Sequence, residues 1–376
     1  MKALFVANTD WYLYNFRIAL AEALRDQGVE VVLVCPPAEH TALLRERGFR
    51  VVDWRLDRGS LTPLRELAAL KRLWRIFRTE RPDMVHNFTI KPDVYGTLLG
   101  RLSGVRYIVN SWTGLGFPFE PGRGAKAFRY FLTPIMRFAL RSRQVWNIFQ
   151  NQENLDELAS AGIVRRDRSV LVQGSGVSTE RFVPPDSLRG TDNAPTVLMA
   201  ARLLRDKGVR EFVEAARKLR SSGSQARFML AGSPDLTNRQ AVSAAELEAW
   251  RDEGIVEFLG HRDDLPALMR DADIGVLPSY HEGLSRFLLE AAASGLPLVA
   301  SDIEGCRPIV HDGVNGILVP PRNVDALAEA ISRLAEDGGL RKTYGDASRA
   351  LVMERFSDER NIQEIFDVYR HIGALS

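Results

Sequence analysis

Four charged side chains in the second half of the chain have types and a spacing suited to a diphosphate joined to a sugar. Arg202 and Lys207 follow one predicted strand, and Glu282 and Glu290 follow another. An arginine offers a fork of donors and a lysine a compact charge, a pair that suits a diphosphate. A carboxylate accepts hydrogen bonds from two neighbouring hydroxyls, as on a sugar ring or a ribose. Two structural interpretations stay open: an exposed loop with ordinary charges for the cations, and stabilisation of a helix dipole for the glutamates.

The elements that would position these side chains alternate along both halves of the chain. Short β-branched runs followed by helical patterns predict right-handed crossovers and parallel sheets, which is an α/β fold. In the first half the predicted strands are 3–7, 29–34, 50–54, 84–86 and 107–110, with helices at 11–27, 41–47, 64–80 and 94–103. In the second half the strands are 196–200, 227–231, 256–259, 274–278 and 298–301, with helices at 209–220, 244–253, 265–270, 286–293 and 324–336.

The domain organisation follows from length and from one segment rich in Gly, Pro, Ser and Asn. A chain of 376 residues is too long for one core, since single cores stop growing near about 250–300 residues. We expect a first domain over 1–180, a linker over 181–195, a second domain over 196–355, and a C-terminal helix over 356–376 that packs back toward the first domain. Two such domains would face each other across a cleft, with ligands outside the carboxyl ends of the strands.

Composition narrows the class of protein. Hydrophobic residues make up 45% and charged residues 26%, close to the average of globular proteins, which disfavours disorder, collagen and coiled coil. No apolar run reaches the roughly 18 residues of a membrane span. The apolar start is too short for a secretory signal and predicts a first strand. Two cysteines suggest neither a disulfide framework nor a metal cluster, so we expect a reducing, cytoplasmic compartment.

Taken together, the second-half motifs resemble the donor site of retaining glycosyltransferases of family 4. The resemblance rests on Arg202-x4-Lys207, on Glu282-x7-Glu290, and on two later motifs at 301–307 (Ser-Asp-x2-Gly-Cys-Arg) and 311–316 (His-Asp-Gly-Val-Asn-Gly). It implies the GT-B fold, in which two Rossmann-like, doubly wound domains face each other across a cleft.

The same resemblance implies a role for each donor-site residue. Arg202 and Lys207 would bind the nucleotide diphosphate and stabilise the leaving group, and Glu290 would hold the ribose hydroxyls. Glu282 would contact hydroxyls of the donor sugar beside the reacting carbon, which makes Arg202, Lys207 and Glu282 the catalytic candidates. Backbone amides would hold phosphate or sugar oxygens along Gly283, Leu284, Ser285 and Arg286. No metal and no other cofactor is expected, because cationic side chains and helix termini would replace them.

Motifs in the first half resemble a narrower branch, the enzymes that extend a sugar linked to polyprenyl diphosphate. They lie at 8–17, 86–92 and 110–116. The branch includes N-acetylgalactosaminyltransferases that act on undecaprenyl-diphosphate carriers. It implies transfer of a hexosamine, such as N-acetylgalactosamine, from a UDP-sugar to a lipid-diphosphate saccharide in lipopolysaccharide or exopolysaccharide assembly. The acceptor-side candidates are Asp10, Asn15, Arg17, His86, Lys91, Asn110 and Trp112.

Three departures from the family pattern limit what can be transferred to this chain. Asn8-Thr9-Asp10 stands where many members have two glycines, and Asn110-Ser111-Trp112 stands where many have a histidine that touches the donor sugar. Pro308 replaces a common glutamate. Trp112, like Trp11, is open to two interpretations, stacking on a sugar face or packing in the core.

Basic residues are concentrated in the first half of the chain. Residues 1–180 contain 26 basic and 18 acidic side chains, net +8, and the rest is net −6. Segment 121–152 holds six basic and no acidic residues among apolar ones, which is typical of a helix lying in a headgroup layer. Segment 64–81 has a similar pattern. The membrane-facing candidates are Lys126, Arg129, Arg137 and Arg141.

These basic segments predict a peripheral protein on an anionic membrane surface, at the cytoplasmic face of the inner membrane. Core-packed helices with a solvated basic side are the alternative. No fold for binding nucleic acid accompanies the charge.

Two other functions stay open on the sequence: a UDP-sugar 2-epimerase of the same architecture, and a non-catalytic lipid-docked scaffold of a glycan assembly complex. The sequence leaves undetermined the donor sugar and base, the acceptor and linkage position, and the oligomeric state. It also leaves undetermined whether Glu282 orients the sugar or acts as a base.

Overall fold

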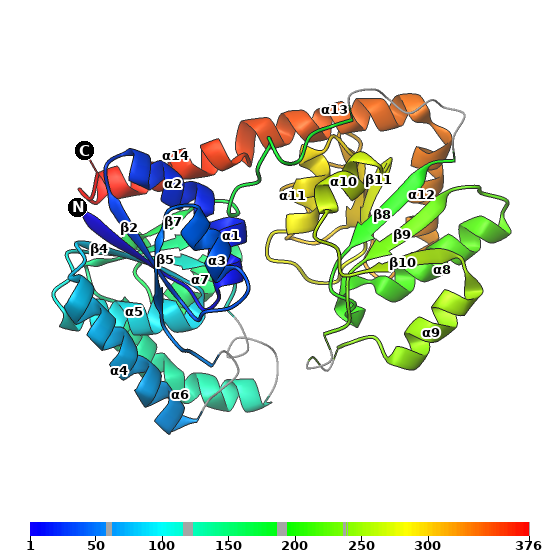
Figure 1. Cartoon of the computed structure of the whole chain (residues 1–376). Helices are drawn as coiled ribbons and strands as arrows, with labels where there is room; N and C mark the ends of the chain where they lie inside the picture. The colour runs from blue at the N-terminus through cyan, green and yellow to red at the C-terminus, as the bar shows by residue number, and fades with distance from the viewer. Residues whose placement is uncertain (58–61, 116–122, 186–193, 236–237, 239, 376) are drawn as a thin grey trace. The chain divides into compact units, whose positions relative to one another are not determined.

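The computed structural model divides the chain into two compact units, and each is described by itself. The first contains residues 1–176 and 361–376, and the second contains residues 177–360 (Figure 1). The structure describes the whole chain except residues 58–61, 116–122, 186–193, 236–237, 239 and 376, and the side chains of 123–128 and 131 are also outside the description.

A parallel sheet of seven strands forms the centre of the first unit, in the order β3-β2-β1-β4-β5-β6-β7. The strands are β1 (Lys2–Val6), β2 (Glu30–Cys35), β3 (Arg50–Asp53), β4 (Met84–Phe88), β5 (Tyr107–Trp112), β6 (Val145–Phe149) and β7 (Ser169–Leu171). The helices are α1 (Asp10–Phe16), α2 (Ile18–Asp26), α3 (Thr41–Glu46), α4 (Pro63–Glu80), α5 (Ile90–Leu102), α6 (Arg123–Leu140), α7 (Gln152–Ser160) and α14 (Asp358–His371). The chain order reverses between β1 and β4, which is the doubly wound arrangement.

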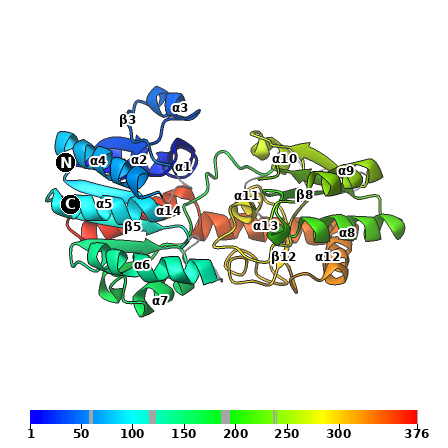
Figure 2. The ribbon, with the colours of Figure 1, turned by 90° about the horizontal axis from the view of Figure 1, so that it is seen from below.

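Side chains that alternate along the strands build a core on each face of this sheet. Phe5 packs toward a core that contains Tyr369 of α14, whereas Leu4 packs toward a core that contains Leu73 and Phe77 of α4. This period of two is what a strand covered on both faces requires. Helices α4, α5 and α6 accordingly cover one face, and α1, α2 and α14 the other (Figures 1 and 2).

The single helix predicted over 11–27 is wrong, because the chain breaks at Arg17 into α1 and α2. Arg17 has φ −130° and ψ −4° and is only 2% exposed. Its guanidinium donates to the Tyr12 hydroxyl from Nε (3.1 Å) and Nη2 (2.9 Å) and lies 4.8 Å from the centre of the Phe88 ring. The break therefore accompanies the burial of a charged side chain, which an amphipathic pattern does not reveal.

A buried ladder of asparagines crosses three neighbouring strands of the first unit. Asn87, Asn110 and Asn147 lie opposite one another on β4, β5 and β6, and all are fully buried. The amide of Asn87 donates to Oδ1 of Asn110 (2.9 Å), and that of Asn110 donates to Oδ1 of Asn147 (3.3 Å). Because buried polar groups need partners, the ladder fixes the register of these strands.

The second unit has its own parallel sheet, in the order β10-β9-β8-β11-β12-β13. Its strands are β8 (Thr196–Ala200), β9 (Arg227–Ala231), β10 (Val256–Gly260), β11 (Ile274–Leu277), β12 (Leu298–Ser301) and β13 (Gly316–Val319). Its helices are α8 (Val209–Ser221), α9 (Ala244–Glu253), α10 (Leu265–Arg270), α11 (Arg286–Ala293), α12 (Val324–Glu336) and α13 (Gly338–Arg355). The order reverses between β8 and β11, so this unit is doubly wound as well.

The predicted class of fold, two doubly wound α/β sheets, is confirmed by the two strand orders. Several elements were not predicted, notably β6, α7, β7, β13 and α13. In the part of the chain that the structure describes, no helix is both long enough and apolar enough to cross a bilayer.

Candidate functional site

Two of the donor-site candidates, Lys207 and Glu282, meet where the strand order of the second unit reverses. Lys207 belongs to a short 3-10 turn, η3 (Arg205–Lys207), that follows β8, and Glu282 lies in the loop that follows β11. The two strands are neighbours, with Ile274 opposite Val197. Their carboxyl ends therefore meet at one edge of the sheet, the place where ligands bind in doubly wound folds.

A close approach of backbone to backbone holds the two loops together. Gly208 has φ +73°, and a Cβ at this position would lie only 2.1 Å from the carbonyl oxygen of Pro278. The Asp206 carbonyl accepts from the Tyr280 amide (2.7 Å) and from the Ser279 hydroxyl (3.1 Å). A glycine is required here for both space and conformation. The loop that carries Lys207 is thus fixed to the loop that carries Glu282.

Lys207 and Glu282 form a direct, largely shielded ion pair. Nζ of Lys207 lies 2.7 Å from Oε1 of Glu282, and the side chains are 16% and 14% exposed. A Cβ on Gly305 would lie 2.3 Å from the carbonyl oxygen of Glu282, so a second glycine permits this loop to pack closely. Burial, with the charge of Glu282, raises the pKa of the Cys306 thiol to about 12. The thiol therefore stays neutral at physiological pH and is a packing group.

Helix α11 presents its N-terminus immediately after this loop. The Ser285 hydroxyl caps it by accepting from the Leu288 amide (3.3 Å). The first amides of a helix have no partner within the helix and favour an anion. Gly283 is exposed, whereas Leu284 is half-buried against the core. This arrangement is compatible with amides that hold phosphate or sugar oxygens.

The two remaining donor-site candidates are paired with other partners. Glu290 is 9% exposed and binds Nε of Arg286, one turn earlier, through Oε1 (2.6 Å). Arg202 has a side chain that is 62% exposed, and its Nη1 lies 3.3 Å from Oδ2 of Asp235. The structure therefore joins Lys207 directly to Glu282, and places Glu290 and Arg202 in separate ion pairs on the same unit.

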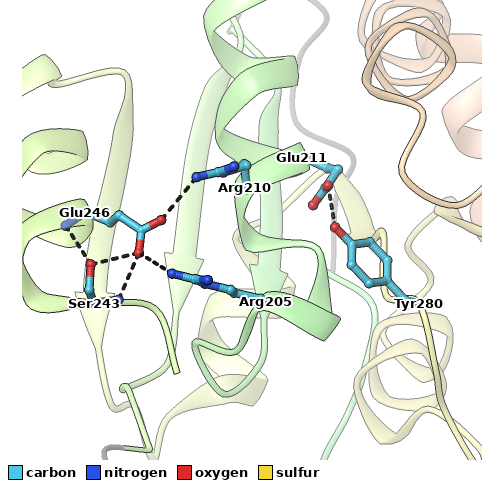
Figure 3. Close-up of polar contacts among 6 residues, drawn as sticks. All are labelled: Arg205, Arg210, Glu211, Ser243, Glu246 and Tyr280. Carbon is cyan, nitrogen blue, oxygen red and sulfur yellow. Dashed lines mark hydrogen bonds and ion pairs between the residues drawn. The ribbon is translucent and has the colours of Figure 1, made fainter. Parts of the chain in front are cut away.

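Tyr280 is a positioning residue that the sequence did not indicate. Its hydroxyl donates to the carboxylate of Glu211 in α8, and burial and this carboxylate raise its pKa well above the usual range (Figure 3). The Arg322 guanidinium lies 4.5 Å from the centre of its ring. Tyr280 thereby ties the loop of Glu282 to α8, and no motif in the sequence links residues 69 positions apart.

Beside it, Arg205 turns toward a different acid. Nη2 of Arg205 and Nη2 of Arg210 both lie 3.2 Å from Glu246, whose carboxylate also bonds Ser243 (Figure 3). Ser243 and Glu246 form the capping box of α9. The hydrogen bonds from Ser243, together with the hydrogen bond and charge of Arg205, lower the pKa of Glu246 to about 2. The Ser-x-x-Glu spacing is a signal that the sequence did contain.

Three of the acceptor-side candidates, His86, Asn110 and Trp112, lie on strands β4 and β5 and are fully buried in the first unit. Nδ1 of His86 lies 2.5 Å from the Tyr369 hydroxyl and Nε2 lies 2.7 Å from the Ser111 hydroxyl. Burial lowers the pKa of His86 well below its ordinary value, helped by the charge of Arg17. Asn110 is the centre of the asparagine ladder.

Trp112, the third of these, is fully buried, stacks on Phe149 at 5.9 Å, and donates from Nε1 to Asn147 (3.0 Å). The core interpretation of Trp112 is therefore correct. The reason is that β4 and β5 each run two residues beyond their predicted ends. The exposed edge of the sheet was expected at His86 and Asn110, which instead lie inside strands.

The other acceptor-side candidates are also held by neighbouring groups. The buried carboxylate of Asp10 accepts from the amides of Trp11 (2.7 Å) and Ala38 (2.9 Å) and from the Thr41 hydroxyl (2.9 Å). Asn15 is half-buried and donates to the Trp11 carbonyl (3.0 Å). Arg17 is the buried residue at the break between α1 and α2. Trp11 itself is 49% exposed, so its ring is open to a ligand.

Lys91 and two of the four membrane-facing candidates have partners on or directly after nearby helices. Nζ of Lys91 lies 2.9 Å from Glu66 of α4. Arg129 pairs with Glu157 of α7 (3.2 Å), and Arg137 donates from Nε (2.9 Å) and Nη2 (2.6 Å) to the Ala161 carbonyl. Arg141 is exposed. Lys126 belongs to the residues whose side chains fall outside the description. Among the described side chains of α4 and α6, the exposed large apolar ones are Leu64, Leu67, Trp74, Tyr130, Ile135 and Phe138.

Comparison with known proteins identifies the class that this fold and site define. The family "Glycosyl transferase 4-like" matches residues 2–152 and "Glycosyl transferases group 1" matches residues 194–337. The chain is 30% identical over 352 residues to the N,N'-diacetylbacillosaminyl-diphospho-undecaprenol alpha-1,3-N-acetylgalactosaminyltransferase of Campylobacter jejuni, covering 91% of each chain. It is 24% identical to the UDP-Gal:alpha-D-GlcNAc-diphosphoundecaprenol alpha-1,3-galactosyltransferase of Escherichia coli, covering 82% of this chain and 81% of that one.

Two solved structures show the same fold over the whole chain. A glycosyltransferase from Rickettsia africae superposes with a TM-score of 0.80 at 20% identity, covering 100% of this chain and 99% of that one. HepE from Anabaena, in complex with UDP, gives 0.78 at 21% identity, covering 99% and 100%. The fold and the matched relatives thus define a GT-B glycosyltransferase. The chain belongs to glycosyltransferase family 4. The epimerase alternative finds no support among these relatives.

Proposed function

We propose that this enzyme transfers a hexosamine, with retention of configuration, from a UDP-sugar to a saccharide linked to polyprenyl diphosphate. The observation that carries the proposal is the Lys207–Glu282 ion pair at the reversal of strand order in the second unit. The Campylobacter relative, whose name describes an N-acetylgalactosaminyltransferase acting on a diphospho-undecaprenol sugar, supports this substrate class. The place of such a reaction is the assembly of a cell-surface glycan.

In this proposal the cations and the helix terminus stabilise the departing UDP. Arg202 and Lys207 bind the diphosphate, and their charge opposes the negative charge that develops as the sugar–phosphate bond breaks. A lysine ammonium has three donors, so Lys207 can serve Glu282 and the diphosphate together. The amides of Gly283 to Arg286 add donors at the start of α11. No metal ion is assigned to this step.

The carboxylates orient the donor. Glu290 has Oε1 bound to Arg286, which leaves Oε2 to accept from a ribose hydroxyl. Glu282, fixed by Lys207, accepts from hydroxyls of the sugar beside the reacting carbon. The acceptor hydroxyl then attacks from the face that the diphosphate leaves, and the diphosphate oxygen takes its proton. Retention of configuration follows from this geometry.

We further propose that the first unit rests on an anionic membrane at the cytoplasmic face. Helix α5 packs between α4 and α6, and both outer helices carry exposed apolar side chains, among them Leu64 (79% exposed) and Phe138 (65%). Exposed apolar groups among basic ones favour a surface of anionic lipid. Arg129 and Arg137 already bind Glu157 and the Ala161 carbonyl. We therefore assign the contact with anionic lipid headgroups to Arg141 and to the arginines of α4.

Transfer with defined substrates tests the function. Purified protein is incubated with a panel of UDP-sugars and a synthetic polyprenyl-diphosphate saccharide, and the product is identified by mass and by the NMR coupling of its new anomeric proton. We expect one UDP-hexosamine to give an α-linked product. An epimer formed from donor alone would support the epimerase instead, and a protein that fails to bind UDP would support the scaffold. Co-sedimentation with vesicles of phosphatidylglycerol, but not of phosphatidylcholine, tests the membrane contact.

A further inference from the structure

A cavity of about 550 Å³ lies in the first unit beside the carboxyl ends of β2 and β3. Its lining comes from Pro36 and Pro37, directly after β2, from residues 55–57, shortly after β3, and from the first turns of α4. Ligands of doubly wound sheets bind outside the carboxyl ends of strands. The volume falls in the range of about 300–1,000 Å³ typical of sites for small molecules.

The described lining of this cavity is strongly cationic. It contains Arg55, Arg65 and Arg72, with Asp57 as its one acid. Nη1 of Arg65 lies 3.0 Å from Oδ2 of Asp57, so that pair is neutral. Arg55 and Arg72 form no ion pair with any residue in the described part of the chain. Two guanidinium groups without a counter-charge in one cavity match an anion that carries at least two charges.

The segment after β3, which carries Arg55 and Leu56 of the lining, is anchored in the core. Trp54 is fully buried and donates from Nε1 to the Ala69 carbonyl of α4 (3.0 Å), which fixes the segment after β3 to the helix. Leu56 is 8% exposed, and the proline pair has a restricted backbone. Arg55 and Arg72 therefore extend from two segments that the core ties together, and such preorganisation lowers the cost of binding.

An apolar strip lies on α4 next to the cavity. Leu64 and Leu67 are 79% and 64% exposed, and they precede the cavity-lining Arg65 and Ala68 by one position each. Successive residues on a helix are rotated by about 100°, so the leucines lie beside the face that lines the cavity. A dicationic cavity that borders an exposed apolar strip suits a ligand with a charged head and an apolar tail.

We infer that this cavity binds the diphosphate of a prenyl diphosphate, with Arg55 and Arg72 on its oxygens and Leu64 and Leu67 against the first isoprene units. The inference deepens the proposed function and rests on it, because it names where the lipid-linked acceptor is held. It assigns a binding role to four residues that lie outside both the donor site and the acceptor-side candidates.

Titration calorimetry with farnesyl diphosphate as the probe tests binding to the cavity. Saturating UDP is present so that the donor site is filled. We expect Arg55→Gln/Arg72→Gln to weaken binding at least about tenfold. The matched control, Arg45→Gln/Arg106→Gln, removes the same charge from exposed positions of the same unit outside the cavity and should retain the wild-type affinity. Leu64→Ser/Leu67→Ser should weaken farnesyl diphosphate but not inorganic diphosphate.

Three outcomes would overturn the inference: equal affinity of the arginine double variant and the wild type, equal affinity for inorganic and farnesyl diphosphate, or binding only to phosphatidylglycerol vesicles.

Steady-state kinetics distinguish a failure of this inference from a failure of the proposed function. The arginine double variant should raise the KM for a polyprenyl-diphosphate acceptor at least about tenfold, with kcat and the KM for UDP-sugar unchanged. An unchanged acceptor KM overturns the inference and leaves the function intact. If the wild type transfers to no such acceptor, the function fails, and the calorimetry still decides the cavity.

Discussion

Lys207 and Glu282 are 75 positions apart in the chain, yet Nζ and Oε1 lie 2.7 Å apart at one edge of the second sheet. Neither side chain is more than one-sixth exposed, so each is the main counter-charge of the other. Removing one partner leaves a poorly solvated charge and also displaces the group that remains. The two residues therefore act as one unit, and their substitution should be interpreted as a pair.

Loss of the donor-site cations should lower turnover by at least about 100-fold, the scale of electrostatic stabilisation of a leaving group. We expect this for Lys207→Ala and for Arg202→Ala in initial rates at saturating donor. Arg205→Ala is the matched control, since Arg205 lies in the same loop but binds Glu246. Near-normal turnover of Lys207→Ala would contradict the assignment. The double variant Lys207→Ala/Glu282→Gln should be little worse than the poorer single variant.

Replacing Gly208 by alanine should damage both stability and catalysis. The new Cβ would lie 2.1 Å from the Pro278 carbonyl oxygen, so the loop of Lys207 has to move. Gly223→Ala is the matched control, because Gly223 also has a positive φ (+91°) but nothing within 4 Å of the added atom. We expect the control to lose roughly 1 kcal/mol of unfolding free energy from backbone strain. Gly208→Ala should lose more in urea denaturation and should lower kcat as well, and equal losses would argue against the packing role.

The Tyr280 hydroxyl should contribute to stability through Glu211. Glu211 is 8% exposed, and its Oε2 has no partner among the described residues, so Tyr280→Phe leaves a buried carboxylate without its donor. The expected cost is about 1–3 kcal/mol of unfolding free energy. Tyr344→Phe is the control, since Tyr344 is buried and its hydroxyl makes no hydrogen bond within the described chain. If Tyr280→Phe/Glu211→Leu loses as much as the sum of its singles, the two groups do not interact.

Stability should fall as the pH drops through about 6.5, the unfolded pKa of histidine, because of His86. Its folded pKa is lowered, so below that pH the unfolded chain binds a proton that the folded chain does not. The slope should approach about 1.4 kcal/mol per pH unit. His86→Gln should remove this slope between pH 7.5 and 5, although the variant is less stable at pH 7.5.

The control for this pH effect is His261→Gln, whose side chain is 73% exposed and should leave the slope unchanged. Asp93 is fully buried with a raised pKa and acts in the opposite sense, since its contribution falls as the pH rises. Comparison of each variant with the wild type at the same pH isolates His86. If stability still falls toward acid pH in His86→Gln as steeply as in the wild type, the effect belongs to another group.

The fold class and the donor loops could be predicted from the sequence because their signals are local. Strand and helix patterns alternate along the chain, and Lys207 and Glu282 each follow a predicted strand of one sheet, so topology alone brings them to the same edge. The direct contact between Lys207 and Glu282 also needs Gly208 and Gly305, where backbone segments distant in the sequence pack closely. Such backbone contacts leave no periodic pattern in the sequence.

The first unit shows where this reasoning fails. Polar residues such as Asn87 and Asn110 indicate a strand end, yet they continue the strand because their side-chain amides hydrogen-bond to one another across the sheet. Arg17 interrupts an amphipathic helix because its charge is accommodated by a tyrosine and a phenylalanine ring. Both errors arise from polar groups whose partners lie on other elements, and only the three-dimensional arrangement identifies those partners.

The division of the chain has a consequence for biosynthesis. Residues 177–360 form an uninterrupted body whose core residues are all translated before residue 361, whereas the body that contains β1 also needs Tyr369 and its neighbours, which are translated later. Residues 1–176 must therefore keep apolar surface uncovered until residues 361–376 have left the ribosome. Loss of α14 would therefore affect the unit whose other residues are made first.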